Sequence, residues 1–367
     1  SVEPVEARAR LAELLGGGAE NRDEQTDYAA DAAAAFQPRV EAGEPRLAIA
    51  EAGTGVGKTL GYIAPASVWA EKNQGPVWIS TFTRNLQRQL DGELDRLFPD
   101  PAEKAERVVI RKGRENYFCL LNFDEALARS SGGRSSARAA AGLGGAKVGG
   151  GSVTALGLMA RWALNTRDGD MVGGDFPAWL TDLLGYGLTT DLTDTRGECI
   201  YSACRHYARC FIEHTVRRAR GADIVVANHA LVMIQAALGG LAGGSGGEGG
   251  LPTRYVFDEG HHLFDAADAA FSAHLSARET ADLRRWILGA EAGSRSRSRG
   301  LRERIGDLID GDAKAMDALA EAIKAVHALP GVGWGNRLAD GAPQGLAEAF
   351  FAFIRQQVYA RDPDGRS

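Results

Sequence analysis

The sequence predicts an α/β fold built on a largely parallel β-sheet. Short runs rich in β-branched residues alternate along the chain with segments of helical periodicity. Several of these runs lack the polar alternation of a strand with one face in water, which is typical of strands covered by helices on both faces. The expected strands are residues 47–51, 77–81, 108–111, 223–227 and 255–258.

Length and composition limit the class of protein. The 367 residues exceed one ordinary domain, so two or three folding units are expected. Apolar residues make up 44% and charged residues 25%, as in globular proteins, and no apolar run approaches the roughly 18 residues of a membrane span. The first residues lack the basic and apolar regions of a secretory signal, so we expect a cytoplasmic location and no membrane association.

The net charge of −6 does not favour binding of nucleic acid through bulk electrostatics. Net charge averages over all faces, however. Basic clusters at 107–114 and 205–220 are able to line a local DNA groove.

A glycine-rich loop at residues 52–59 has the composition of a phosphate cradle. It stands between an expected strand and an apolar, helix-compatible segment, the order that a P-loop requires. Its glycines let backbone N–H groups turn toward phosphate oxygens, while Lys58 neutralises the β- and γ-phosphates and Thr59 offers a hydroxyl to Mg²⁺. The expected ATP ligands in the loop are Gly53, Thr54, Gly55, Val56, Gly57, Lys58 and Thr59.

A pair of carboxylates follows the last expected strand. Asp258 would stand at the carboxyl edge of the sheet, where it can hold Mg²⁺. Glu259 can orient and deprotonate the water that attacks ATP. With Lys58, this pair predicts an ATP hydrolase.

The four cysteines of the chain all lie between these two motifs, and none is left over. They are Cys119, Cys199, Cys204 and Cys210, the last three spaced C-x4-C-x5-C. A cytoplasmic location disfavours disulfides. Four thiolates suit either a [4Fe–4S] cluster or zinc, and the residues alone leave both open.

The last hundred residues or so are expected to be helical. Apolar side chains recur there at spacings of three and four, and we expect them to pack between helices. They are Met316, Leu319, Ile323 and Val326, then Leu346, Phe350, Phe353 and Ile354.

As a set, the motifs resemble superfamily 2 helicases of the DinG-type, XPD-like branch. Residues 258–261 resemble the D-E-x-H box in its glycine-bearing form, and residues 81–87 resemble motif Ia. Residues 228–231 resemble the stretch that precedes the box. Arg22 and Gln25 resemble the adenine-reading Q motif.

The resemblance implies a RecA-like P-loop NTPase with two additions. Residues 1–111 and 216–263 would form the first motor domain, 112–215 an inserted iron–sulfur domain, and 264–367 an α-helical, arch-like segment. Residues 112–119 resemble the approach to the first cluster ligand of DinG-like helicases, which favours iron–sulfur over zinc.

In function, the resemblance implies an ATP-dependent DNA helicase, with 5′ to 3′ direction, acting on single-stranded and forked DNA irrespective of base sequence. His261 would couple nucleotide state to DNA binding. The expected DNA contacts are Thr81, Thr83, Arg84 and Gln87 in motif Ia, with Lys112 and Arg114 before the cluster.

Motifs of a second motor domain are not found in the sequence. We therefore expect that domain in a longer protein, and expect this chain alone to hydrolyse ATP slowly if at all. Two alternatives remain. One is a nucleotide-switched DNA clamp that does not translocate; the other is a P-loop ATPase with a zinc module.

Overall fold

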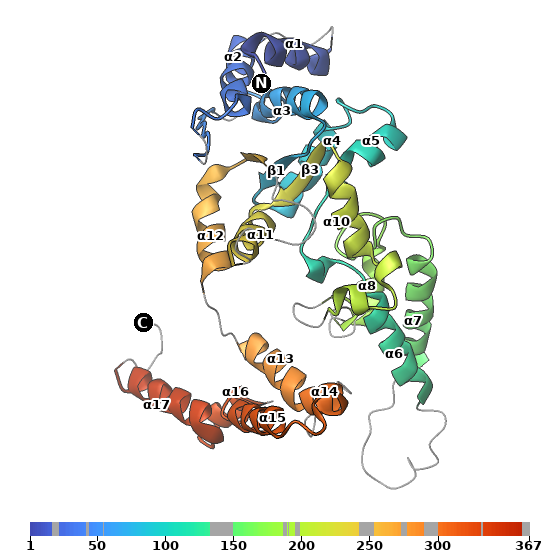
Figure 1. Ribbon diagram of the computed structural model, residues 1–367, viewed down its shortest axis with the longest axis vertical. Coiled ribbons are helices and arrows are strands. Elements are labelled where there is room, and N and C mark those ends of the chain that lie inside the picture. Colours follow the sequence, from blue (N-terminus) through green and yellow to red (C-terminus); the bar gives the residue numbers. More distant parts are fainter. Residues whose placement is uncertain are drawn as a thin grey trace. The chain divides into compact units, whose positions relative to one another are not determined.

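The computed structural model divides the chain into two compact units, Ser1–Ser272 and Ala273–Ser367 (Figure 1). It describes residues 1–16, 22–41, 44–53, 55–132, 150–185, 189, 191–194, 199–241, 253–272, 277–289, 300–331 and 333–361. Within these ranges no helix combines the length and apolar character needed to cross a membrane.

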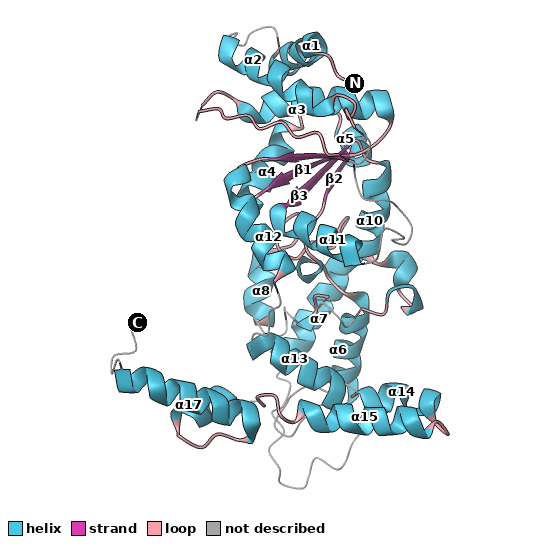
Figure 2. Ribbon diagram, turned by 60° about the vertical axis from the view of Figure 1, so that its left-hand side comes forward, coloured by secondary structure: helices cyan, strands magenta, loops and turns pink. Residues whose placement is uncertain are grey.

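The first unit is built on a four-stranded parallel sheet in the order β2-β3-β1-β4 (Figure 2). Val77 at the start of β1 pairs with Ile224 on one side and Arg254 on the other. This confirms the predicted α/β class. The strands are β1 (Val77–Thr81), β2 (Val108–Ile110), β3 (Ile224–Asn228) and β4 (Arg254–Phe257).

Helices cover both faces of the sheet, which explains why the strands lack polar alternation. Ile79 and Val226 pack with the N-terminal helices, while Trp78 and Val225 on the opposite face pack near α10 and α11. The helices around the sheet are α1 (Pro4–Leu15), α2 (Asp23–Ala32), α3 (Lys58–Asn73), α4 (Arg84–Glu93), α5 (Pro101–Arg107), α10 (Phe211–Gly221), α11 (His229–Leu241) and α12 (Leu263–Phe271). Short 3-10 helices lie at Ala33–Phe36, Arg114–Asn116, Tyr201–Ala203, Tyr207–Arg209 and Gly260–His262.

The predicted strand at 47–51 does not form, so that expectation is wrong. The segment has no regular secondary structure, and Leu47 and Ile49 are 78% and 89% exposed. A strand needs a neighbour for its backbone groups. Among the described residues, nothing pairs with the outer edge of β4, and this segment joins neither that edge nor any other.

A second core forms within the predicted insertion 112–215. Phe118, Met159 and Leu180 are almost fully buried there. The helices are α6 (Leu120–Gly132), α7 (Gly150–Ala163) and α8 (Ala178–Leu184). A core separate from the sheet agrees with an inserted domain, whose boundaries stay a prediction.

The second unit is helical throughout its described residues, as predicted. Leu319 and Val326 of the first apolar stripe are buried, but Met316 is half exposed. The second stripe is not core, contrary to expectation: Leu346, Phe350, Phe353 and Ile354 are 42–79% exposed. The helix instead buries the face that carries Glu348, which an ion pair with Arg337 holds. The helices are α13 (Ala277–Leu288), α14 (Leu301–Ile309), α15 (Ala313–Val326), α16 (Trp334–Ala339) and α17 (Gly345–Arg361).

Candidate functional site

The glycine-rich loop turns directly into α3, as its sequence predicted. Gly55 and Gly57 have φ angles of +88° and +85°, a conformation that favours glycine. Gly57 precedes Lys58, the first residue of α3, so the positive end of the helix faces the loop. Of the predicted phosphate ligands, the structure describes Gly53, Gly55, Val56, Gly57, Lys58 and Thr59; Thr54 lies outside the described residues.

Folding brings the carboxylate pair to this loop. Nζ of Lys58 lies 3.5 Å from Oε1 of Glu259, although 201 positions separate them in the chain. Asp258 follows β4, and its N–H donates to the carbonyl of Ser80 at 2.8 Å, which extends the sheet contact by one residue. Burial, and then the charge of Glu259, raises the pKa of Asp258 above its ordinary value.

The backbone at Glu259 is strained. Its φ of 54° and ψ of 50° lie in the left-handed region, which costs a residue with a side chain about 1–2 kcal/mol. Its Oε2 lies 3.5 Å from Nδ1 of His261, so the carboxylate stands between Lys58 and this histidine. Such strain is typical of functional sites.

An aromatic stack joins motif Ia to the carboxylate box. The rings of Phe82 and His262 lie 3.7 Å apart and 13° from parallel, and His261 follows with its centroid 4.0 Å from that of His262. Phe82 lies between the predicted DNA contacts Thr81 and Thr83, whereas His261 contacts Glu259. The stack is therefore a direct physical connection between the two motifs.

The predicted DNA contacts of motif Ia differ in accessibility. Thr83 caps α4 by accepting a hydrogen bond from the N–H of Leu86 at 3.2 Å, and it is exposed, as is Arg84. Thr81 and Gln87 are buried. Of the four predicted contacts in this motif, Thr83 and Arg84 are therefore the two that DNA can reach without a rearrangement.

Lys112 and Arg114 are held by carboxylates. Nζ of Lys112 contacts Asp170, and Nε of Arg114 lies 2.6 Å from Oδ2 of Asp194. Arg107, in the same basic cluster, pairs with Asp223. These ion pairs give the basic residues a structural role, and a DNA contact by Lys112 or Arg114 stays a prediction.

The predicted Q-motif residues contact the phosphate loop. Arg22 donates to the carbonyl of Gly55 at 2.8 Å, and buried Gln25 donates to the carbonyl of Gly57 at 2.9 Å. Both also line a cavity of about 300 Å³ that borders Thr59. The two residues thus stand where the phosphate loop meets an open cavity.

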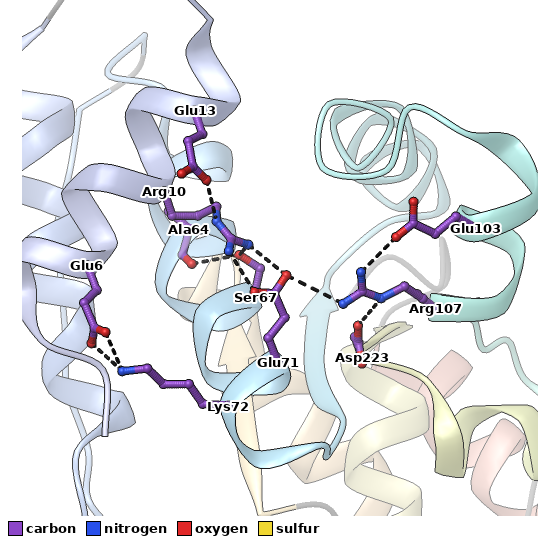
Figure 3. Close-up of polar contacts among 10 residues, drawn as sticks. All are labelled: Glu6, Arg10, Glu13, Ala64, Ser67, Glu71, Lys72, Glu103, Arg107 and Asp223. Atoms are coloured by element: carbon purple, nitrogen blue, oxygen red, sulfur yellow. Dashed lines mark hydrogen bonds and ion pairs between the residues drawn. The ribbon is translucent and has the colours of Figure 1, made fainter.

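Ion pairs fasten α1 to α3, as Figure 3 shows. Lys72 of α3 donates to Glu6 of α1, and Arg10 donates to Glu71 at 2.8 Å. Glu71 also pairs with Arg107, which continues the contacts to the start of β3. The hydrogen bond from Arg10 lowers the pKa of Glu71. This network fixes α1 on the P-loop helix.

The sequence assigned no role to two buried side chains of the site, although one of them, His229, lies in the stretch 228–231 that resembles the family. Tyr62 lies one helical turn after Lys58, and burial, followed by the charge of Asp258, raises its pKa well above the ordinary value. His229 is 1% exposed, and its Nδ1 lies 2.7 Å from Oγ of Ser80. Helical spacing from Lys58 was a usable signal for Tyr62. The contact between His229 and Ser80 depends on which strands are neighbours in the sheet, so the sequence held no signal for it.

All four cysteines line one cavity. Burial raises the pKa of Cys119 to about 12 and also raises that of Cys210. Arg114 donates to Sγ of Cys199 at 2.9 Å, and the N–H of Tyr201 lies 3.4 Å from the same sulfur. In the described part of the chain, no three His, Cys, Asp or Glu side chains are grouped closely enough to hold a single metal ion.

Comparison with known proteins supports the family that the motifs indicate. No family model matches the chain. The ATP-dependent DNA helicase YoaA of Haemophilus influenzae is 30% identical over 262 residues, covering 68% of this chain and 36% of that protein. The ATP-dependent helicase DinG of Mycobacterium tuberculosis is 32% identical over 271 residues, covering 71% and 37%.

A third relative, the 3′-5′ exonuclease DinG of Bacillus subtilis, is 29% identical over 283 residues, covering 74% of this chain and 25% of that protein. The chain thus spans little more than a third of the length of the two helicases, and a smaller share of the third protein. The matches confirm the resemblance drawn from the motifs: the chain is related to the DinG-type ATP-dependent helicases.

Proposed function

We propose that the chain is the ATP-binding motor part of a DNA helicase that moves 5′ to 3′ along single-stranded and forked DNA. The observation that carries this proposal is the 3.5 Å contact between Lys58 and Glu259. It joins a phosphate loop to a carboxylate pair at the carboxyl ends of parallel strands, where α/β proteins bind their ligands.

The residues of the site divide the work of ATP hydrolysis. Lys58 neutralises the β- and γ-phosphates, and Thr59 and Asp258 would hold Mg²⁺, which supplies positive charge to the phosphates. Glu259 orients the attacking water and accepts its proton. His261, 3.5 Å from Glu259, is placed to sense the state of that carboxylate.

The DNA contact in this proposal begins at motif Ia. Thr83 and Arg84 are exposed at the N-terminal end of α4, where side-chain and backbone donors suit phosphate oxygens and read no base. Phe82 precedes them and stacks on His262. A movement of this loop on DNA binding would therefore be passed to His261 through the stacked rings of Phe82 and His262.

For the cysteines we propose a [4Fe–4S] cluster held by Cys119, Cys199, Cys204 and Cys210. Support comes from the cavity that all four line and from the Arg114 donor beside Cys199. The cluster would cross-link the inserted domain; a zinc ion on the same thiols is the competing assignment.

ATP hydrolysis measured with and without single-stranded DNA tests the function. We expect hydrolysis by this chain alone to be slow, DNA to raise that slow rate, and Glu259→Gln to remove hydrolysis while ATP still binds. Glu106→Gln, an exposed carboxylate on α5, is the control. If ATP changes DNA affinity but DNA never raises hydrolysis, the chain is a nucleotide-switched DNA clamp and the proposed helicase function is wrong.

The metal is tested separately by anaerobic purification, absorption spectroscopy and metal analysis. A broad band at roughly 400 nm with about four irons per chain supports the cluster. Colourless protein that stays so after reconstitution with iron and sulfide, and that carries zinc, contradicts it.

A further inference from the structure

Tyr62 of α3 carries a buried hydroxyl for which the motifs give no role. The side chain is 3% exposed, and it follows Thr59 by about one turn of the same helix. Among the described residues, no group completes a hydrogen bond to its Oη. A buried polar group without a partner costs about 1–3 kcal/mol, so this hydroxyl calls for an explanation.

Two side chains of the proposed Mg²⁺ site act on this hydroxyl. Burial, and then the charge of Asp258, raises the pKa of Tyr62, whereas its contact with the hydroxyl of Thr59 lowers that pKa. Burial also raises the pKa of Asp258, and the contact with Tyr62 opposes this rise. The hydroxyl of Tyr62 therefore lies next to both Thr59 and Asp258, although neither contact has the full geometry of a hydrogen bond.

The chemistry of the three groups sets the direction of these contacts. A carboxylate only accepts hydrogen bonds, whereas a hydroxyl both donates and accepts. A threonine hydroxyl whose lone pair is given to Mg²⁺ keeps its proton to donate. Tyr62 is therefore suited to accept from Thr59 and to donate to Asp258, which orders the three side chains in one chain.

We propose that Tyr62 is a positioning residue that holds Thr59 and Asp258 in the arrangement that binds Mg²⁺. Its buried hydroxyl touches neither the ion nor the nucleotide and acts through these two ligands. The inference rests on the proposed function, in which Thr59 and Asp258 hold the ion. Loss of an outer partner of this kind typically weakens metal binding by roughly 10–100-fold.

A role in packing has to be separated from this role in positioning, because the ring of Tyr62 belongs to the core under the N-terminal helices. Tyr62→Phe separates the two, since it keeps the ring and removes only the hydroxyl. No described residue completes a hydrogen bond to that hydroxyl, so its loss should not destabilise the fold. The variant is therefore expected to unfold at or above the wild-type temperature.

The test measures how much Mg²⁺ tightens the binding of a non-hydrolysable nucleotide, the β,γ-imido analogue of ATP. Calorimetry is carried out with saturating Mg²⁺ and again with EDTA in place of the metal. In Tyr62→Phe, affinity in EDTA should match wild type, and the gain in affinity from Mg²⁺ should fall about tenfold. Neither quantity depends on the rate of hydrolysis.

Tyr255→Phe is the matched control. Tyr255 belongs to β4, the strand that ends before Asp258, and its ring stacks on Phe257. Burial alone raises its pKa to about 12. The same loss of a hydroxyl there should leave binding of the analogue unchanged under both conditions, whereas Thr59→Ala, which removes a proposed ligand, should lose the gain from Mg²⁺.

Four results would overturn the inference. A wild-type gain from Mg²⁺ in Tyr62→Phe, with Thr59→Ala still losing it, removes the role of Tyr62 and leaves the proposed function standing. Equal weakening with and without Mg²⁺ assigns the hydroxyl to the phosphate loop. A variant that unfolds well below the wild-type temperature shows that the hydroxyl is bonded within the fold. Wild-type protein that binds no analogue overturns the proposed function, and this inference with it.

Discussion

Replacement of Gly57 by alanine should distort the phosphate loop, because this glycine is restricted in two ways. Its φ of +85° is unfavourable for a residue with a side chain. A Cβ atom built there would also lie 2.2 Å from Nε2 and 2.8 Å from Cδ of Gln25. The buried Gln25 has to move, and its 2.9 Å hydrogen bond to the Gly57 carbonyl is lost.

The expected cost combines these two effects. A left-handed backbone costs a residue with a side chain about 1–2 kcal/mol, and a lost hydrogen bond about 0.5–1.5 kcal/mol. The free energy of unfolding should therefore fall by roughly 1.5–3.5 kcal/mol. For a unit of this size, the unfolding temperature should fall by about 3–14 °C.

Thermal unfolding of Gly57→Ala measures this cost, and Gly53→Ala is its control. Gly53 belongs to the same loop, but a Cβ atom added there would meet no atom within 4 Å beyond its chain neighbours, and its φ is not positive. The control should unfold as wild type does in the absence of nucleotide. If Gly57→Ala also unfolds at the wild-type temperature, the contact between Gln25 and the phosphate loop is wrong.

Three other substitutions test separate parts of the structure. Phe82→Ala removes the stack on His262, worth about 0.5–1.5 kcal/mol, so DNA stimulation of ATP hydrolysis should weaken several-fold while ATP affinity holds; an unchanged response to DNA would contradict the connection. Arg10→Met breaks the ion pairs of Arg10 with Glu13 and Glu71 and should lower the free energy of unfolding by about 1–2 kcal/mol in chemical denaturation; equal stability would show that these two pairs contribute nothing. The hydrogen bond from Arg337 lowers the pKa of Glu348 to about 2, so this ion pair contributes its full stabilisation above about pH 5 and loses it as the pH falls toward 2. Glu348→Gln should therefore flatten the acid side of a plot of unfolding free energy against pH, and an unaltered plot would refute this.

The fold was predictable where local sequence and sheet position agree. The runs that became β1, β2, β3 and β4 were found to within a residue at either end, because buried parallel strands are short apolar runs. Residues 47–51 are also a short, mainly apolar run and still form no strand. Pairing depends on a neighbour elsewhere in the chain, which composition does not reveal.

The same distinction applies to the site. Lys58 and Glu259 were predictable because each stands in a motif whose chemistry requires it. The stack of Phe82 on His262, and the contact of His229 with Ser80, join residues that are distant in sequence and carry no local signal. The exposed stripe of α17 shows the converse, because helical periodicity predicts an apolar face and not what covers it.

Binding of Mg²⁺-ATP to wild-type protein and to Lys58→Ala tests the central claim most directly. Calorimetry should find one site per chain in wild type, and affinity at least about tenfold weaker in the variant, because a charged contact to phosphate is lost. Lys324→Ala, an exposed lysine of the second unit, should bind as wild type does. Absence of ATP binding in wild type, or equal affinity in Lys58→Ala, would contradict the assignment of a nucleotide site at the head of α3.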